Sequence, residues 1–427
     1  MPELYVSRIL ENGLLIQLLE IHTVPLISQW IWYRVGSRNE QPGITGISHW
    51  VEHMQFKGTP KFPLGVLDRM VSKEGGIWNA MTYMDWTTYF ETMPADKIDV
   101  ALELEVDRMR NSNFDKNETE AERTVVISER EGNENEPLFL LNSAVQLAAF
   151  QNHPYRHEVI GELQDLQTIT QQQLLGYYQT YYAPNNAVLA LAGDFDAQKM
   201  MVQLEKMFAE IAPVAQPTQT LVQEPEPNEE KRVEVHGPGE TRYLQIAYQA
   251  PAANNGDFFP MTVLDSLLSG PSSLIMFGGG SISNRTSRLY QALVEKELAM
   301  SVSGGLQATI DPFLHSFLLT LHPQADIDAV LRIFDEEMER VQNEQVDDFE
   351  IARAIKQAKA MFAYGSENIT NQAFWLGYAN MFANYDWYTH YVERLEQVSK
   401  EDIQNSARNY LIPKKRVVGI FTPSERS

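Results

Sequence analysis

The sequence predicts an α+β fold made of two related halves. Three observations support this: strand and helix patterns cluster instead of strictly alternating, a proline-rich segment divides the 427 residues near their middle, and a pattern at Thr170 recurs 229 positions later. At about 100–200 residues per domain, the chain holds two or three domains. We expect an N-terminal domain over residues 1–212, a linker over 213–230 and a homologous C-terminal domain over 231–427.

The first half begins with strand patterns and continues with helical ones. Runs rich in apolar, β-branched and aromatic residues predict strands over residues 13–19, 27–35, 76–92 and 187–192. Apolar residues spaced near 3.6 positions apart predict helices over residues 47–56, 96–109, 117–130, 137–150, 170–182 and 197–211. Glycines at 43 and 46 precede the first of these helices, and Thr170 is a suitable N-cap.

The proline-rich linker and the repeated pattern both indicate that the chain consists of two related halves. Residues 212–231 hold four prolines among Gln, Thr and Glu, a composition typical of an extended linker. In the first half the repeated residues are Thr170, Leu174, Tyr181, Pro184 and Val188; in the second they are Ser399, Ile403, Tyr410, Pro413 and Val417. Both sets combine an N-cap with a proline that ends a helix before a strand. The pattern favours an internal duplication, and coincidence is the alternative.

Charge and cysteine content exclude several classes of protein. The 34 Lys and Arg against 57 Asp and Glu give a net charge of −23, which argues against binding to nucleic acid or to an anionic membrane. The absence of cysteine excludes disulfides and thiolate sites, so a transition metal must be held by His, Asp or Glu. The start has no signal-peptide pattern, and no apolar run is long enough to span a bilayer. We expect a cytoplasmic protein, with the periplasm as the alternative.

A metal-binding pattern lies on the helix expected over residues 47–56. His49 and His53 are four residues apart, so both imidazoles project from one face and can share one ion. Glu52 is adjacent and suited to act as a general base, because a bound zinc ion lowers the pKa of water toward neutrality. Two surface histidines on an ordinary amphipathic helix are the alternative.

A third ligand is expected on the helix over residues 117–130. Glu122 and Glu129 are seven residues apart, which places them on one face of that helix. A run of glutamates on a solvated face is the alternative interpretation.

These motifs together resemble the inverzincins, the M16 metallopeptidases of the pitrilysin family, in particular the short bacterial branch similar to mitochondrial processing peptidase. H-x-x-E-H is followed by two glutamates, the second 76 residues after His53. Further similar blocks lie at residues 32–38, 52–59, 75–80, 89–94, 153–155, 182–186, 193–194, 267–269 and 287–290. The resemblance implies two tandem domains, each a mainly antiparallel sheet packed with helices, that form a clam-like peptide chamber.

Carried over residue by residue, the resemblance assigns roles to the site. His49, His53 and Glu129 match the ligands of one zinc ion, Glu52 matches the general base, and Glu122 matches the carboxylate that orients a ligand imidazole. The substrate-binding matches are Asn79, Ala80 and Arg288. Asn79 and Ala80 lie on a strand expected to pair with the substrate backbone, although an ordinary structural asparagine is the alternative for Asn79.

The sequence departs from the family at a tyrosine. Self-sufficient members carry Gly-Leu-Ala-Tyr where this chain has Glu297-Leu298-Ala299-Met300, and a thioether cannot donate the hydrogen bond of a phenol. Tyr290 lies in another register. In the processing-peptidase branch, one chain carries zinc and its homologous partner supplies the Arg/Tyr pair. We therefore expect the zinc-bearing member of a heterodimer, with a self-sufficient homodimer as the alternative.

A second departure is the lengthened segment over residues 269–287, which contains Gly278-Gly279-Gly280. No Gly-Lys-Ser/Thr follows, so a phosphate-binding loop is disfavoured. A flexible loop over the chamber or against a partner and a disordered insertion are the two alternatives.

The function expected from these observations is that of a zinc-dependent endopeptidase acting on short or unfolded peptides through a metal-activated water. The strongly negative charge suggests a chamber that favours basic or neutral peptides. The alternative is a non-catalytic scaffold or assembly subunit of an M16-like heterodimer. Members of that kind typically lose zinc residues, whereas His49, Glu52, His53 and Glu129 are all present.

Overall fold

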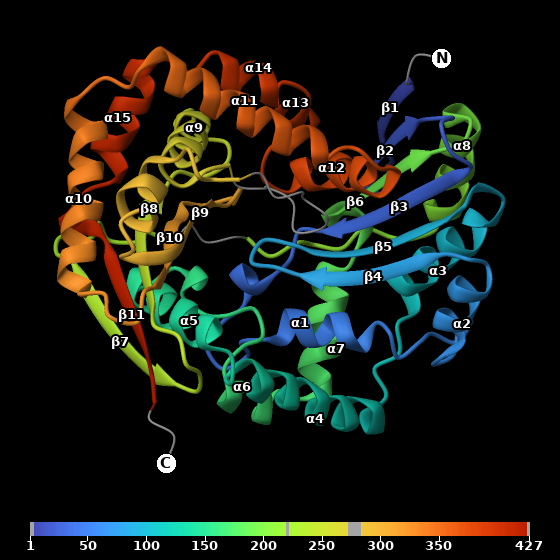
Figure 1. The fold of residues 1–427 in the computed structure, drawn as a ribbon. Helices are drawn as coiled ribbons and strands as arrows, with labels where there is room; N and C mark the ends of the chain where they lie inside the picture. The colour runs from blue at the N-terminus through green and yellow to red at the C-terminus, as the bar shows by residue number, and fades with distance from the viewer. Residues whose placement is uncertain (1–3, 219–221, 272–282, 425–427) are drawn as a thin grey trace. The chain divides into compact units, whose positions relative to one another are not determined.

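The computed structural model describes residues 4–218, 222–271 and 283–424 and has a mixed α+β fold with two sheets packed against helices (Figure 1). The Gly278–Gly280 stretch lies outside the described residues. Within the described ranges, the helices are all too short or too polar to cross a membrane. The predicted α+β class is therefore confirmed.

The chain forms two compact units that are not contiguous in sequence. Unit 1 contains Met1–Arg130, His157–Leu221 and Ser366–Tyr385, and unit 2 contains Glu131–Arg156, Val222–Gly365 and Asp386–Ser427. The described residues of the expected linker, 213–218 and 222–230, form neither helix nor strand. The domain boundaries at 212 and 231 stay a prediction.

Unit 1 is built on a six-stranded sheet. In sheet order its strands are β1 (Leu4–Ile9), β2 (Leu15–Glu20), β6 (Ala187–Gly193), β3 (Leu26–Tyr33), β5 (Thr87–Pro94) and β4 (Ile77–Thr82). Only β2 and β6 run parallel; the other described neighbours are antiparallel. Its helices are α1 (Ile47–Met54), α2 (Val66–Lys73), α3 (Ile98–Asn111), α4 (Lys116–Asn133), α6 (Leu163–Thr168), α7 (Gln171–Tyr181), α8 (Ala197–Phe208) and α12 (Ile369–Phe382).

Helices cover both faces of this sheet, so its central strand β3 is buried on both sides (Figure 1). On one face, Trp32 of β3 makes edge contacts with Phe374 of α12 at 5.2 Å between ring centroids. On the other face, Ile31 belongs to the core that also contains Trp50 of α1. The continuous apolar run of β3 follows from this two-sided burial.

Unit 2 is built on a five-stranded sheet. In sheet order its strands are β7 (Lys231–Gly237), β11 (Val417–Pro423), β8 (Tyr243–Ala250), β10 (Phe313–Leu321) and β9 (Ala299–Leu306). Its helices are α5 (Pro137–Ala149), α9 (Phe258–Ser269), the π-helix η5 (Tyr290–Val294), α10 (Ile327–Asn343), α11 (Asp348–Tyr364), α13 (Tyr385–Thr389), α14 (Tyr391–Glu396) and α15 (Lys400–Tyr410).

The two sheets share one topology, which confirms the predicted duplication. The order β2-β6-β3-β5-β4 matches β7-β11-β8-β10-β9, and each sheet has one parallel pair, at β2–β6 and β7–β11. The predicted N-caps are also confirmed, because Thr170 and Ser399 both form capping boxes, at α7 and α15. Pro184 and Pro413 each open a short turn directly before the strands β6 and β11.

Each sheet is covered by a helix from the other half of the sequence. The helix α5 comes from the first half and packs on β11 and β7, and α12 comes from the second half and packs on β3 and β6. Both contacts need glycine: a Cβ at Gly419 of β11 would lie 2.4 Å from Val145 of α5, and one at Gly377 of α12 would lie 2.0 Å from Nε1 of Trp32. The repeats have therefore exchanged corresponding helices.

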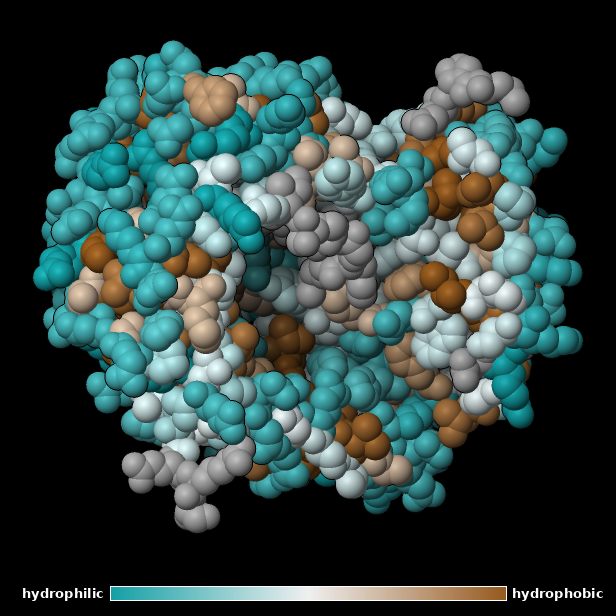
Figure 2. Space-filling model, in the orientation of Figure 1, coloured by the Kyte–Doolittle hydropathy of each residue, from teal (hydrophilic) through white to brown (hydrophobic). Residues whose placement is uncertain are grey.

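Hydrophilic side chains dominate the face drawn in Figure 2, and hydrophobic ones form small separate groups on it. The described strand β1 has no counterpart in the five-stranded sheet, and it exposes Leu4, Tyr5 and Ile9. Isolated exposed apolar residues of this kind are normal for a protein surface.

The close approach of α12 to β3 gives a test of the fold. We expect Gly377→Ala to destabilise the protein by about 1–3 kcal/mol, because the new methyl group would overlap the fully buried Trp32. The matched control is Gly176→Ala in α7, where no atom lies within 4 Å of the added Cβ. It should leave stability unchanged or raise it by up to about 1 kcal/mol. Thermal unfolding measures both, and equal midpoints for the two variants would contradict the packing described.

Candidate metal centre

The helix α1 carries the predicted metal motif and is held by its apolar face. Ile47, Trp50, Val51 and Met54 are buried, which leaves the imidazoles of His49 and His53 on the opposite side. The helix begins at Gly46, whose φ of 86° lies in the left-handed region. A Cβ there would lie 2.4 Å from the carbonyl oxygen of Ile160, so glycine is required.

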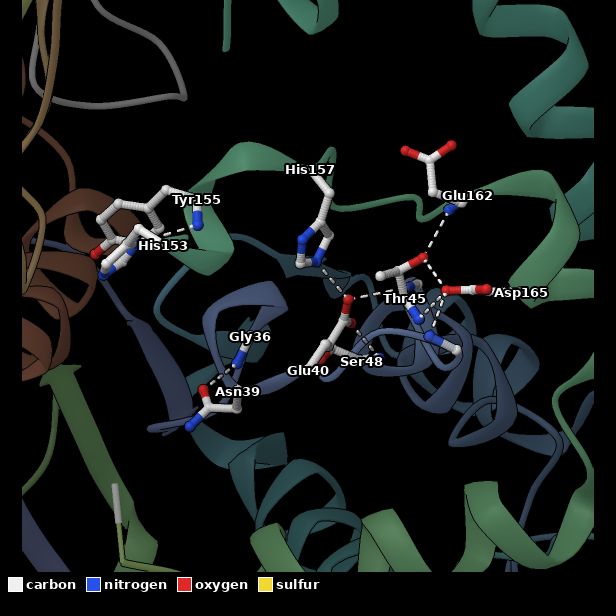
Figure 3. A network of polar contacts seen from close by, with 12 residues as sticks. Gly36, Asn39, Glu40, Thr45, Ser48, His153, Tyr155, His157, Glu162 and Asp165 are labelled. Carbon is white, nitrogen blue, oxygen red and sulfur yellow. Dashed lines mark hydrogen bonds and ion pairs between the residues drawn. The ribbon is translucent and has the colours of Figure 1, made fainter. Parts of the chain in front are cut away.

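Two carboxylates fix the start of α1 (Figure 3). The buried side chain of Glu40 accepts hydrogen bonds from the backbone N–H groups of Gly46 (2.8 Å) and Ser48 (2.9 Å), and Nε2 of His157 lies 3.0 Å from it. Asp165 accepts from the N–H and the hydroxyl of Thr45 at 2.9 and 2.7 Å. These bonds satisfy donors that a helix N-terminus leaves unpaired and set the position of the helix.

The structure brings together the three predicted zinc ligands. The rings of His49 and His53 lie 4.5 Å apart between centroids. Glu129, on α4, places one oxygen 3.8 Å from Nε2 of His49 and the other 3.6 Å from Nε2 of His53. One ligand atom from each residue lies within 4.8 Å of the others.

This arrangement fits a zinc ion. Two imidazole nitrogens and one carboxylate oxygen form a ligand set of catalytic zinc sites, which keep a fourth position open. Ligand atoms bound tetrahedrally at about 2.0–2.1 Å lie about 3.4 Å from one another, close to the observed 3.6 and 3.8 Å.

Glu122 orients one of the imidazoles. Its Oε1 lies 2.8 Å from Nδ1 of His53, and its other oxygen pairs with Lys57. Although burial opposes the charged form, the hydrogen bonds from His53 and Lys57 lower the pKa of Glu122, so its carboxylate is ionised. With the Nδ1 proton held by Glu122, Nε2 of His53 presents its lone pair toward His49 and Glu129.

Burial also sets the protonation of the neighbouring groups. It lowers the pKa of His49 to about 3, which keeps this imidazole neutral and able to bind a metal. It raises the pKa of Glu52 to about 7, against the opposing hydrogen bond from Thr82. A carboxylate with a pKa near neutrality is suited to take up and release a proton.

Asn79 and Ala80 lie on β4, the last strand of the unit 1 sheet. Among the described strands, β4 pairs only with β5, so its other edge is open. The side chain of Asn79 is exposed, and its Oδ1 accepts from the backbone N–H of Ala80 at 2.9 Å. That N–H therefore points away from β5, toward the side where another strand can add.

Arg288 belongs to unit 2. Its guanidinium forms a bidentate pair with Glu350, with Nε and Nη2 at 3.1 and 2.8 Å from the two carboxylate oxygens. Met300 is half-exposed on β9. Glu297, which stands where the family has glycine, has a φ of 59°, in the left-handed region that favours glycine.

Sequence reasoning missed the residues that support the site. Glu40, Thr82, His157 and Asp165 belong to no motif in the sequence. Their partners lie far away in sequence: Thr82 is 30 residues from Glu52, and His157 is 117 residues from Glu40. The sequence contains no local signal for such contacts.

The whole-chain comparisons agree with the geometry. The model described as Insulinase (Peptidase family M16) matches residues 18–162, which include all the predicted zinc residues, and the model described as Peptidase M16 inactive domain matches residues 168–358. The chain belongs to the M16 peptidase family.

Similar M16 proteins extend over most of the chain. A zinc protease, PqqE of Helicobacter pylori, is 28% identical over 391 residues, covering 89% of this chain and 82% of the relative. Mitochondrial-processing peptidase subunit beta of Lentinula edodes is 25% identical over 397 residues, covering 92% and 84%. The crystal structure of a protease from Helicobacter pylori matches with a TM-score of 0.89 at 25% identity, covering 99% of this chain and 100% of that chain.

The contact between Glu122 and His53 gives a test of the M16 site. We expect Glu122→Gln to weaken zinc binding by about 10- to 100-fold, because the amide no longer fixes the imidazole as a carboxylate does. Glu131→Gln, at an exposed position on the same helix, is the matched control and should bind zinc like the wild type. Competition with a chromogenic chelator measures both affinities. Equal affinities for the two variants would exclude this role of Glu122.

Proposed function

We propose that the protein is a zinc-dependent endopeptidase that hydrolyses short or unfolded peptides. The observation that carries this proposal is the convergence of His49 and His53 of α1 with Glu129 of α4. Glu52 lies on the same helix α1, whose start is held by the buried carboxylate of Glu40. The names of the zinc proteases and processing peptidases to which the chain is similar also support it. In this proposal one zinc ion binds per chain.

Zinc held by these three residues would supply a Lewis acid that polarises a peptide carbonyl and makes water acidic near neutral pH. The chain's own residues would orient the metal ligands, transfer the protons and align the peptide. Glu122 holds the Nδ1 proton of His53 and so keeps Nε2 available. Glu52 removes a proton from the attacking water and delivers it to the leaving amine. The edge of β4 at Asn79 and Ala80 aligns the peptide by adding it to the sheet as a strand.

A non-catalytic scaffold is the second candidate function. It is favoured by the name of the model that matches residues 168–358, Peptidase M16 inactive domain. That segment contains none of the zinc residues, which all fall within the match over 18–162. We therefore favour the peptidase.

We further propose that the chain is the zinc-bearing member of a heterodimer with a homologous subunit. Its likeness to a protein named mitochondrial-processing peptidase subunit beta supports a two-subunit organisation. The guanidinium of Arg288 is paired with Glu350, and Met300 occupies the position where self-sufficient members have tyrosine. The partner subunit would therefore supply an Arg/Tyr pair. A self-sufficient homodimer is the alternative.

The general-base role is tested by Glu52→Gln. We expect this variant to bind zinc like the wild type and to lose about 10²- to 10⁴-fold in kcat on a quenched peptide, because the amide cannot accept the proton. His53→Ala is the comparison variant and should lose the metal itself, as elemental analysis would show. Cleavage by Glu52→Gln at the wild-type rate would refute the assignment.

The partner proposal is tested with the same peptide and the purified chain. We expect slow cleavage by the chain alone and a faster rate after addition of a homologous subunit that carries the Arg/Tyr pair. Met300→Tyr should raise the activity of the chain alone, by up to about 100-fold, because a phenol can donate a hydrogen bond to a developing oxyanion. Met300→Phe, which adds the ring without the hydroxyl, is the control. Full activity of the unmodified chain without a partner would contradict the heterodimer.

A further inference from the structure

Thr82 connects the edge strand of unit 1 to the proposed general base. It is the last residue of β4 and is buried, and its hydroxyl donates a hydrogen bond of 2.6 Å to Oε2 of Glu52. Among the described residues, the hydroxyl of Thr82 is the hydrogen-bond donor to the side chain of Glu52.

The neighbouring hydrogen bonds determine which acceptor receives the hydroxyl proton of Thr82. Its oxygen also lies 3.3 Å from the hydroxyl of Thr87, but that hydroxyl donates its own proton to the carbonyl of Val35 at 2.9 Å. A hydroxyl has one proton, and a 2.6 Å contact with a carboxylate is typical of a strong, charge-assisted bond. The proton of Thr82 is therefore directed at Glu52.

We propose that Thr82 is the positioning residue for Glu52, and that it sets this carboxylate from the same strand that receives the peptide. Asn79 and Ala80 precede it on β4 by three and two residues. A peptide that adds to the edge of β4 restricts the motion of this strand. The hydrogen bond from Thr82 then restricts the position of the Glu52 carboxylate. This inference rests on the proposed peptidase function and adds a residue to which neither the sequence motif nor the comparisons point.

A positioning role predicts an effect on turnover and not on binding. We expect Thr82→Val, which keeps the shape and removes the hydroxyl, to lower kcat by about 10- to 100-fold, the effect of losing one hydrogen bond to a charged group. KM and zinc content should stay at wild-type values. Thr82→Ser, which restores the hydroxyl, should recover most of kcat.

The matched control is Thr88→Val on the neighbouring strand. Thr88 is buried like Thr82, and its hydroxyl donates to the carbonyl of Ile31 at 2.8 Å, away from the site. This variant should keep the wild-type kcat. The proposal is overturned if Thr82→Ser is as impaired as Thr82→Val, or if Thr82→Val loses zinc or changes only KM.

A measurement without substrate separates this inference from the proposed function. In the metal-free protein, Thr82→Val should lower the midpoint of thermal unfolding in the wild-type background but less in a Glu52→Met background, where no carboxylate remains to be bonded. Equal shifts in the two backgrounds would overturn the role of Thr82. A wild-type chain that cleaves no peptide, with or without a partner, would refute the peptidase proposal, and the unfolding comparison would still decide on Thr82.

Discussion

The buried carboxylate of Glu40 fixes the start of α1, and the geometry of the candidate metal centre depends on these hydrogen bonds. Apolar contacts are not directional, so by themselves they do not specify the axial position of a helix as hydrogen bonds do. Two backbone N–H groups bonded to one buried carboxylate, which is itself paired with His157, remove that freedom. His49, Glu52 and His53 then project from a helix whose axial position is set from outside it, as a preorganised site requires.

Only one of the two repeats carries such a centre among the described residues. In unit 1, α1 follows β3 and presents two histidines to Glu129. In unit 2, α9 follows β8 and is buried along its whole length. Its Asp265 lies 2.8 Å from the buried His315 of β10, so the polar groups of this region satisfy one another inside the core. The same arrangement of strands and helices thus presents a candidate metal site in unit 1 and buries its polar groups in the core of unit 2.

Local features of the fold were predictable, and long-range ones were not. Helix spans, the N-caps at Thr170 and Ser399 and the spacing of His49 and His53 follow from contacts between residues at most four apart, which a sequence displays directly. The apolar residues of the helix over 369–382 are spread around it without a distinct polar face, which indicates burial but does not say which sheet buries it. The bonds of Glu40 and Thr82 join segments that only the fold brings together.

The exchange of α5 and α12 between the two halves affects when each sheet can be covered during synthesis of the chain. The residues of the candidate metal centre lie in the first half of the sequence, yet one face of the unit 1 sheet is covered by α12, which ends at Phe382 of 427 residues. While the ribosome is still making the second half, Trp30 and Trp32 have no helix over them. This face of the unit 1 sheet therefore stays uncovered until α12 has been synthesised.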